Sequence, residues 1–218
     1  MATIISISDT HTQHDLLTSE LLDIHHKNPD GILIHCGDIS HRGRNHEVED
    51  FLDWYSSLPF EHKILISGNH DFLFENNRSL AKAMISERGE NIIYLEDSGV
   101  EIQGLKFWGS PVTPWFYDWA FNRREDIKNH WDLIPNDVNI LITHGPPYKI
   151  LDQTISGLNV GCKNLSKKIE SLTSLKLSLF GHIHEAAGLV KIGDVIYNNA
   201  SILDERYQIK NHPYVFHI

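Results

Sequence analysis

The chain has 218 residues, of which 41% are apolar and 22% are charged, a balance that is typical of soluble globular proteins and excludes disordered and fibrous classes. No apolar run approaches the length of a membrane-spanning helix, and we expect a single domain over residues 1–218. The formal net charge of −10 argues against broad binding to nucleic acid or to an anionic membrane, because both depend on a basic face.

The first part of the chain, up to Gly89, alternates between strand-like and helix-like patterns. Short apolar runs that are typical of strands cover residues 4–8, 32–36 and 64–67. Apolar residues then recur at helical spacing after each of these runs, in residues 16–24, 48–55 and 80–85. This alternation predicts parallel strands joined by right-handed crossovers.

The middle and the end of the chain predict more strands and a mixed sheet. Further strand-like runs cover residues 92–95, 100–102, 105–108, 140–143 and 177–180, and closing strands are expected at 189–192, 195–197 and 214–217. Turn residues at 97–99, 103–104 and 193–194 predict hairpins, and residues 163–174 resemble an amphipathic helix. The expected fold class is therefore α/β.

One segment is too rich in proline for a regular element and too rich in aromatic residues for an ordinary loop. It runs from Pro111 to Trp119, and aromatic residues occupy positions 115, 116, 117, 119 and 121. These side chains either stack on a nucleobase at the mouth of a site or provide packing or a homodimer interface. The second reading is favoured, since aromatic residues are enriched at such interfaces.

Five of the strand-like runs end in side chains that bind metals. The residues that follow the runs are Asp9-Thr10-His11, Gly37-Asp38, Gly68-Asn69-His70-Asp71, His144-Gly145 and Gly181-His182-Ile183-His184. In open α/β sheets, ligands bind just outside the carboxyl ends of the parallel strands, so these donors are expected to meet in one crevice. The layout is that of a two-metal hydrolytic site.

The spacing within these motifs suggests how the donors are shared. Asp9 and His11 are two residues apart, so on an extended strand end both side chains point the same way and bind one cation, and His182 and His184 share that spacing. Each motif alone has a plainer explanation, because Asp and His also cap helices and satisfy turns. The five together have no comparable structural explanation.

The remaining donors define the kind of metal. Asp38 is the best candidate for a carboxylate that bridges two cations, Asn69 offers a carbonyl oxygen, and His144 an imidazole nitrogen. A set of oxygen and nitrogen donors without thiolate suits Mn, Fe, Zn or a mixed pair better than a structural zinc site. We therefore expect two divalent or trivalent ions, with Mn or Fe favoured and Zn possible.

The two cysteines and the N-terminus add little to the functional reading. Cys36 and Cys162 are too few for a disulfide framework and lack CxxC spacing, so both are expected to be small buried hydrophobes. The chain passes from Met1-Ala2-Thr3 directly into its first strand-like run, without a basic segment or a cleavable apolar stretch. A cytoplasmic location is the resulting expectation.

The series D-x-H, G-D, G-N-H-D, H-G and G-H-x-H resembles the calcineurin-like metallophosphoesterase superfamily, and the resemblance extends from Asp9 to His184. Finer details, such as Thr143-His144-Gly145-Pro146-Pro147 and Asn199-Ala200-Ser201, resemble the metallophosphoesterase-domain-containing (MPPED-type) branch. That branch is similar to class III cyclic nucleotide phosphodiesterases. The resemblance implies a mixed-sheet α/β sandwich with the metal site at the strand carboxyl ends.

The same resemblance implies a role for each donor. One metal would be held by Asp9, His11, Asp38 and His184, and the other by Asp38, Asn69, His144 and His182. His70 matches the catalytic histidine of the family and would assist departure of the leaving oxygen. The attacking group would be a hydroxide that bridges the metals, and no covalent enzyme intermediate is required.

One departure from the superfamily narrows the substrate. Its protein phosphatases carry G-D-x-x-D-R-G after the bridging aspartate, whereas this chain has His41 where the second aspartate would be. Protein dephosphorylation is therefore less favoured. Arg42 either clamps a phosphate or is an exposed loop arginine, Lys149 either lies near the site or is solvated, and Glu185 either orients an imidazole or is a surface acid.

The leading hypothesis is a metal-dependent phosphodiesterase that hydrolyses small phosphodiesters, with cyclic nucleotides as the class that the resemblance implies. A phosphomonoesterase acting on a small phosphorylated substrate is the alternative within enzymes. A non-catalytic scaffold on the same fold is disfavoured, because every position of the metal pattern is filled and His70 is intact.

Overall fold

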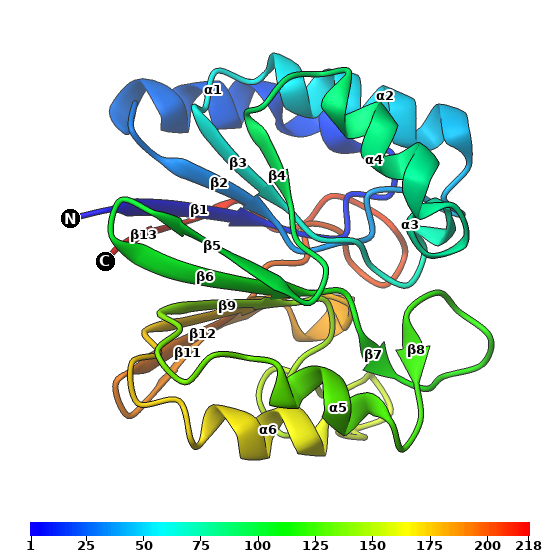
Figure 1. Ribbon diagram of the computed structural model, residues 1–218, viewed down its shortest axis with the longest axis vertical. Helices are drawn as coiled ribbons and strands as arrows, with labels where there is room; N and C mark the ends of the chain where they lie inside the picture. The colour runs from blue at the N-terminus through cyan, green and yellow to red at the C-terminus, as the bar shows by residue number, and fades with distance from the viewer.

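The computed structural model describes all 218 residues, and it contains two sheets that lie face to face between layers of helices (Figure 1). The first sheet has the order β13-β1-β2-β3-β4, and all of its strands except β13 are parallel. Its strands are β1 (Thr3–Ile7), β2 (Ile32–His35), β3 (His62–Leu65), β4 (Ile92–Tyr94) and β13 (Tyr214–His217). The parallel strands predicted for the first part of the chain are confirmed.

The second sheet is mixed, with the order β11-β12-β10-β9-β6-β5. Its strands are β5 (Ser98–Ile102), β6 (Leu105–Ser110), β9 (Ile140–Thr143), β10 (Leu177–Phe180), β11 (Gly188–Ile192) and β12 (Val195–Asn199). The pairs β5–β6 and β11–β12 are antiparallel hairpins, and the other pairs are parallel. A small parallel pair, β7 (Thr113–Pro114) and β8 (Asn122–Arg123), stands outside both sheets.

Helices cover the outer face of each sheet. The first sheet is covered by α1 (Thr18–Lys27), α2 (Asn45–Ser57), α3 (Phe72–Asn76) and α4 (Arg78–Ser86), and the second by α5 (Ile127–Asp132) and α6 (Lys163–Ile169) (Figure 1). Two short 3₁₀ helices, η1 (His14–Leu17) and η2 (His184–Ala186), complete the set. No helix combines the length and the apolar character that crossing a membrane requires.

The core explains why the central strands read as unbroken apolar runs. Ile32 and Ile34 of β2 face the interior between the sheets, where Ile140 and Ile142 of β9 belong to the same buried cluster. Leu33, which alternates with them, faces the helices on the outer side. A strand that is buried on both faces needs apolar residues at every position, so its sequence shows no polar alternation. The α/β sandwich with mixed sheets is confirmed.

Two of the predicted elements are wrong in detail. The turn residues Asp97-Ser98-Gly99 do not form a hairpin, because β4 belongs to the first sheet and β5 to the second, so the chain crosses between the sheets there. The helix expected over 163–174 ends at Ile169. The hydroxyl of Ser171 donates to the carbonyl of Lys168, 2.6 Å away, a local hydrogen bond that favours turns at a helix end.

Both sheets present the carboxyl ends of their parallel strands at one shared edge. Ser8, directly after β1, forms a parallel bridge with Ser201, which follows the end of β12 and Ala200. The amide of His182, after β10, donates to the carboxylate of Asp9, after β1, and Nδ1 of His144, after β9, bonds to the carbonyl of Cys36, after β2. Loops that follow strands of different sheets are therefore in direct contact.

Candidate metal centre

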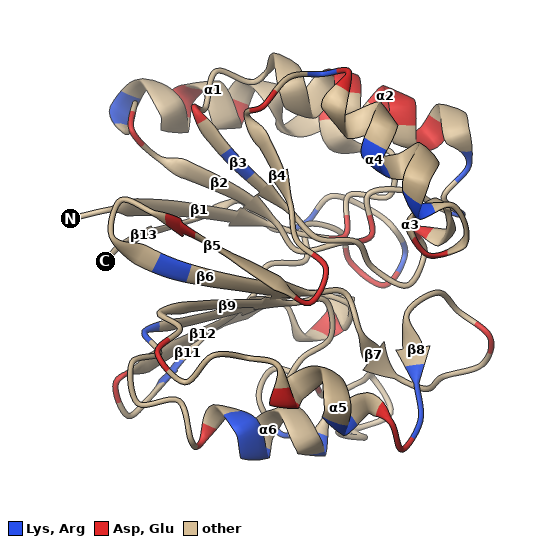
Figure 2. Cartoon of the chain, in the orientation of Figure 1, with Lys and Arg blue, Asp and Glu red and all other residues tan.

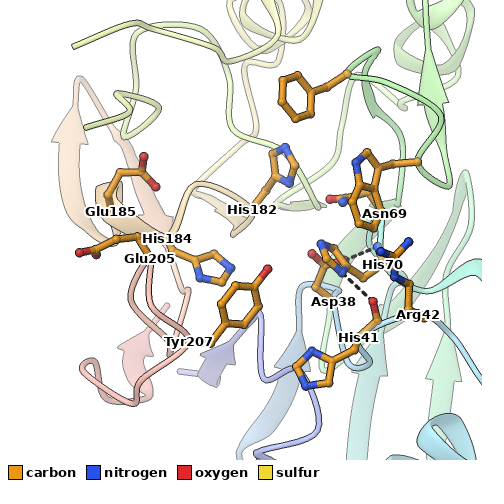
Figure 3. A pocket seen from close by; sticks show the side chains of 12 residues that line it. Asp38, His41, Arg42, Asn69, His70, His182, His184, Glu185, Glu205 and Tyr207 are labelled. Carbon is orange, nitrogen blue, oxygen red and sulfur yellow. Dashed lines mark hydrogen bonds between the residues drawn. The ribbon is translucent and has the colours of Figure 1, made fainter. Parts of the chain in front are cut away.

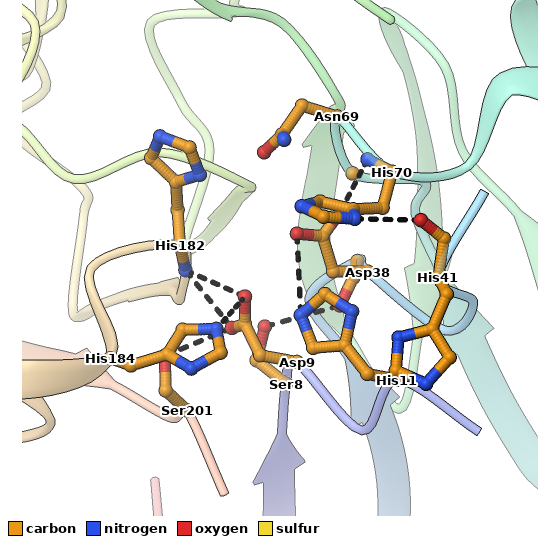
Figure 4. Close-up of polar contacts among 12 residues, drawn as sticks. Ser8, Asp9, His11, Asp38, His41, Asn69, His70, His182, His184 and Ser201 are labelled. Carbon is orange, nitrogen blue, oxygen red and sulfur yellow. Dashed lines mark hydrogen bonds and ion pairs between the residues drawn. The ribbon is translucent and has the colours of Figure 1, made fainter. Parts of the chain in front are cut away.

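The loops after β1, β2, β3, β9 and β10 bring the predicted donors together at the shared edge (Figure 4). Three overlapping groups have their ligand atoms within 4.8 Å of one another: Asp9, His11 and His184; His11, Asp38 and His70; Asp38, His144 and His182. The first and third groups divide the donors between two neighbouring positions. These are the two sets that the family resemblance implies, with Asn69 next to the second.

Asp38 lies between the two positions. Its Oδ2 atom is 3.7 Å from Nε2 of His11 and 3.3 Å from Nε2 of His144. On the first side Nε2 of His184 lies 3.3 Å from Oδ1 of Asp9, and on the second side Nε2 of His144 lies 2.9 Å from Oδ1 of Asn69. One carboxylate oxygen therefore faces an imidazole of each group, which is the placement that a bridging ligand requires.

Backbone carbonyls orient three of the imidazoles in the same way. Nδ1–H of His11 donates to the carbonyl of Ser40, 3.0 Å away, and Nδ1–H of His144 donates to the carbonyl of Cys36, 2.9 Å away. His184 donates in the same way to the carbonyl of Asp204, 3.0 Å away. A carbonyl can only accept, so each bond places a proton on Nδ1 and turns Nε2 toward the centre. These Nε2 atoms all belong to the centre.

The donor set fits metal cations on two observations. Nε2 of His11 is buried and has no hydrogen-bond partner. Burial lowers the pKa of this imidazole to about 4, even though the charge of Asp38 acts in the opposite direction. The imidazole is therefore neutral, and its Nε2 atom carries an unpaired lone pair. Nε2 of His144 lies 2.9 Å from Oδ1 of Asn69, so an imidazole nitrogen and an amide oxygen, two atom types that bind metals, face the same position. The unpaired lone pair of His11 in a buried site is costly, and a cation beside it removes that cost.

Electrostatics lead to the same conclusion. Asp9 and Asp38 are almost completely buried. Burial alone would raise the pKa of each, but His184 beside Asp9 and His144 beside Asp38 hold both pKa values below the ordinary range. Burial likewise opposes protonation of His144 and His184, yet the two carboxylates raise the pKa of each to about 9. The buried carboxylates therefore require positive charge next to them, and cations supply it directly.

The backbone around these donors is strained, and this corrects one prediction. Asp9, His11, Asp38 and His182 all have positive φ angles, of 53°, 39°, 56° and 71°. The strand ends are therefore not extended, and spacing by two does not decide which side chains meet, since Asp9 and His11 share a group but His182 and His184 do not. His182 joins Asp38 and His144, whereas His184 joins Asp9, so the expectation that both histidines bind one cation is wrong. Strain of this kind is concentrated at functional sites.

Close packing explains the glycines that precede the donors. A Cβ atom on Gly181 would lie 2.0 Å from Oδ2 of Asp9 and 2.1 Å from Oγ of Ser8. A Cβ atom on Gly68 would lie 2.2 Å from Oδ1 of Asp38. Any side chain at either position would displace a carboxylate of the centre, so the glycines in G-N-H-D and G-H-x-H are a packing requirement.

Two supporting residues were not identified as such from the sequence. The hydroxyl of Ser201 donates to Oδ2 of Asp9, 2.9 Å away, and the amide of His182 donates to the same oxygen. Asp71 is fully buried and accepts from the amides of Ser40 and Gly68, so it ties the loop of Asp38 to the loop of Asn69. The motifs contained both residues, but only the folded chain shows what they contact.

His41 contributes to the centre through its backbone. Nδ1–H of His70 donates to the carbonyl oxygen of His41, 2.8 Å away, and the amide of His70 donates to Oδ1 of Asp38. In Figure 4 the other ring nitrogen of His70 points away from His41 and toward the side of His182. A carbonyl therefore holds the histidine where the protein phosphatases have an aspartate, and the loss of that carboxylate leaves His70 oriented.

The centre opens into a pocket of about 540 Å³. Besides metal-site residues, its lining includes Arg42, Phe116, Trp119, Glu185, Glu205 and Tyr207. Figure 3 shows the Tyr207 hydroxyl pointing into the space near His184 and Asp38. Glu205 and Tyr207 were missed because the loop after Ser201 carries no motif, and only its contact with the β1 loop brings it to the site.

The sequence left two possible roles each for Arg42, Lys149 and Glu185, and the structure shows where these residues lie. Arg42 lines the pocket, with its guanidinium carbon 5.0 Å from the ring centre of Trp119, whereas Lys149 does not line it. Glu185 lines it too, but accepts from the amide of Ile155 and touches no imidazole through a hydrogen bond.

The aromatic segment divides into parts with different surroundings. Phe121 is buried in the core, and the ring of Trp119 lies 4.3 Å from that of His70. Trp115, Phe116 and Tyr117 are exposed.

The packing at Gly181 gives a direct test. Gly181→Ala should displace Asp9 and weaken metal binding by roughly tenfold or more, the usual cost of disturbing the groups that support a ligand. Metal content is measured after dialysis against limiting Mn²⁺, with Gly104→Asn as control, because nothing lies within 4 Å of a Cβ atom there. Ser201→Ala, which removes one bond to Asp9 without adding bulk, should act in the same direction. Wild-type affinity in both variants would contradict the assignment of Asp9.

Comparison with known proteins places the chain in a family. Residues 2–186 match the calcineurin-like phosphoesterase family. Human metallophosphoesterase domain-containing protein 1 is 37% identical, over 97% of this chain and 69% of the relative. A UPF0046 protein of Caenorhabditis elegans is 33% identical, over 99% of this chain and 74% of the relative.

Solved structures support the fold. A protein of Thermus thermophilus superposes with a TM-score of 0.66 at 14% identity, covering 96% of this chain and 97% of the other. An archaeal phosphodiesterase superposes with a TM-score of 0.53 at 17% identity, covering 98% and 99%. With the family match over most of its length, its metallophosphoesterase relatives and two groups of facing donors, the chain belongs to the calcineurin-like phosphoesterase family.

Proposed function

We propose that this protein is a metal-dependent phosphodiesterase that hydrolyses small phosphodiesters, with cyclic nucleotides as the first class to examine. Membership of the phosphoesterase family supports the reaction type, and the two donor groups around Asp38 support the need for two ions. Retention of every donor and of His70 argues against a scaffold that has lost catalysis.

The two donor sets differ in composition. Asp9, His11, Asp38 and His184 would hold one ion, and Asp38, Asn69, His144 and His182 would hold the other. Bound divalent ions at these positions would neutralise charge on the phosphoryl oxygens and lower the pKa of water. The chain itself contributes the buried carboxylates that retain the ions and the carbonyl-bound imidazoles that fix their positions.

The charge at the mouth of the centre is the observation that favours diesters. Arg42 is the one Lys or Arg side chain that lines the pocket, and Glu185 and Glu205 line it as well. A phosphomonoester arrives with up to two negative charges at the reacting phosphate and a diester with one, so the nearby acids penalise the monoester more. Helix α2, which begins three residues after Arg42, contains Glu and Asp but no Lys or Arg (Figure 2).

His70 is placed to handle the proton of the leaving group. It lines the pocket, and its Nδ1–H is fixed on the carbonyl of His41, which leaves Nε2 for the substrate. Trp119 packs against its ring and restricts its rotation. In its protonated form, an imidazole in this position donates the Nε2 proton to the leaving alkoxide as the ester bond breaks, while Nδ1–H stays bonded to the carbonyl.

A substrate screen tests the proposal. The purified protein, reconstituted with Mn²⁺, should hydrolyse bis(4-nitrophenyl) phosphate and cyclic nucleotides, and 4-nitrophenyl phosphate with about tenfold lower kcat/KM, equivalent to about 1.4 kcal/mol. A chelator should abolish turnover, and added Mn²⁺ should restore it. Preference for the monoester would identify a phosphomonoesterase instead, and no turnover of either class would support a scaffold.

The role of His70 predicts a dependence on the leaving group. His70→Ala should reduce turnover of a cyclic nucleotide by about two to four orders of magnitude, the usual contribution of acid-base assistance. The loss should be much smaller for bis(4-nitrophenyl) phosphate, because 4-nitrophenolate departs without a proton. Metal content should stay at the wild-type value, and His46→Ala, at an exposed position of α2, serves as control. Equal losses on both substrates would contradict a proton-donating role.

A further inference from the structure

We propose that a groove next to the metal centre binds a planar apolar ring on one arm of the substrate. This inference rests on the proposed phosphodiesterase function and names the class of diester that the site accepts. The groove has a volume of about 470 Å³ and lies between residues 114–116 on one side and residues 154–161 on the other. Pro146 and Ile183 line it between these walls.

The groove is continuous with the metal centre. His182, one of the predicted ligands, and Phe116 line both the groove and the pocket that contains Asp38 and His70. A phosphoryl group at the centre therefore has one ester arm that can extend past His182 into the groove. This continuity identifies the occupant as part of the substrate.

The first wall, residues 114–116, is held in place by contacts with residues 122–124. The amide of Trp115 donates to the carbonyl of Arg123, and the amide of Phe116 donates to Oδ1 of Asn122, 2.7 Å away. The guanidinium carbon of Arg124 lies 3.7 Å from the ring centre of Trp115. The hydrogen bonds thus fix the backbone of Trp115 and Phe116, the cation–π contact holds the Trp115 ring, and both side chains remain exposed.

The second wall is built around a buried carboxylate. Asp152 is 1% exposed and accepts from the amides of Lys149 and Gly161 and from the side-chain amide of Asn159, at 2.9, 2.8 and 2.6 Å. These bonds shape residues 149–161 into a defined loop, so Val160 is presented to the groove by an ordered backbone. Neither wall needs to be ordered by the ligand.

The lining chemistry favours ring contact over hydrogen-bonded recognition. Three of the fourteen large exposed apolar side chains line the groove: Trp115, Phe116 and Val160. The hydroxyl of Thr154 already shares a hydrogen bond with that of Ser156, and His182 is the one ionisable side chain in the lining. A flat ring gains contact area here without needing polar partners.

Two phosphonates isolate the contribution of the ring. Phenylphosphonate and methylphosphonate share the head group that the metals bind and differ in the arm alone. Calorimetry on the Mn²⁺-loaded protein should show phenylphosphonate binding roughly tenfold or more tightly, because stacking on an aromatic side chain is worth about 1–3 kcal/mol. Trp115→Ala and Val160→Ser should bring the two affinities to within about threefold of each other, which removes most of that stacking gain.

Matched variants separate the groove from general surface effects. Tyr117→Ala and Leu158→Ser remove exposed apolar side chains from the same loops, but neither residue lines the groove, so the preference for phenylphosphonate should stay unchanged. Binding of uridine 5′-monophosphate, which carries a different flat ring, is measured in the same way. If Trp115→Ala weakens it as well, the groove accepts any flat ring, and if only phenylphosphonate is weakened, the groove is assigned to aryl esters.

The two proposals fail in different ways. If the protein turns over bis(4-nitrophenyl) phosphate but binds both phosphonates equally, the groove has no role in binding and this inference is wrong while the phosphodiesterase function stands. Unchanged preference in Trp115→Ala and Val160→Ser also overturns it. If the protein neither turns over the diester nor binds either phosphonate, the proposed function itself fails.

Discussion

The structure depends on two aspartates that are buried where the two sheets meet. Asp9 and Asp38 are almost completely shielded from water, and charged carboxylates in such a place are unfavourable unless positive charge lies beside them. The protein supplies imidazoles whose Nδ1–H groups are occupied by backbone carbonyls, so their Nε2 atoms face the centre, as ligands of cations would. The requirement for neutralising charge thus links the fold to the chemistry.

The sandwich provides what a single sheet would not. Loops from β1, β2 and β3 carry four of the seven donors and loops from β9 and β10 the other three, and Asp38 faces imidazoles from loops of both sheets. Apolar packing between the sheets therefore sets the distance between the two groups of donors. The same edge carries the pocket with Arg42 and the groove beside His182, so the proposed catalytic centre and the proposed binding groove share one frame.

Much of this arrangement could be predicted from the sequence, because apolar runs that end in donors identify both strands and ligands. The pattern could not show that the strands form two sheets, since Asp97-Ser98-Gly99 has the same composition whether it closes a hairpin or crosses between sheets. The pairing of His182 with Asp38 depends on a positive φ angle that composition does not reveal. Tyr207 reaches the site from a loop without any motif, through tertiary contact alone.

The central claim is that Asp38 joins two metal ions. A crystal grown with excess Mn²⁺ and measured for anomalous scattering tests it most directly. The account predicts two peaks, one on each side of the Asp38 carboxylate, the first next to Asp9, His11 and His184 and the second next to Asn69, His144 and His182. A single peak, or none at saturating Mn²⁺, would contradict it.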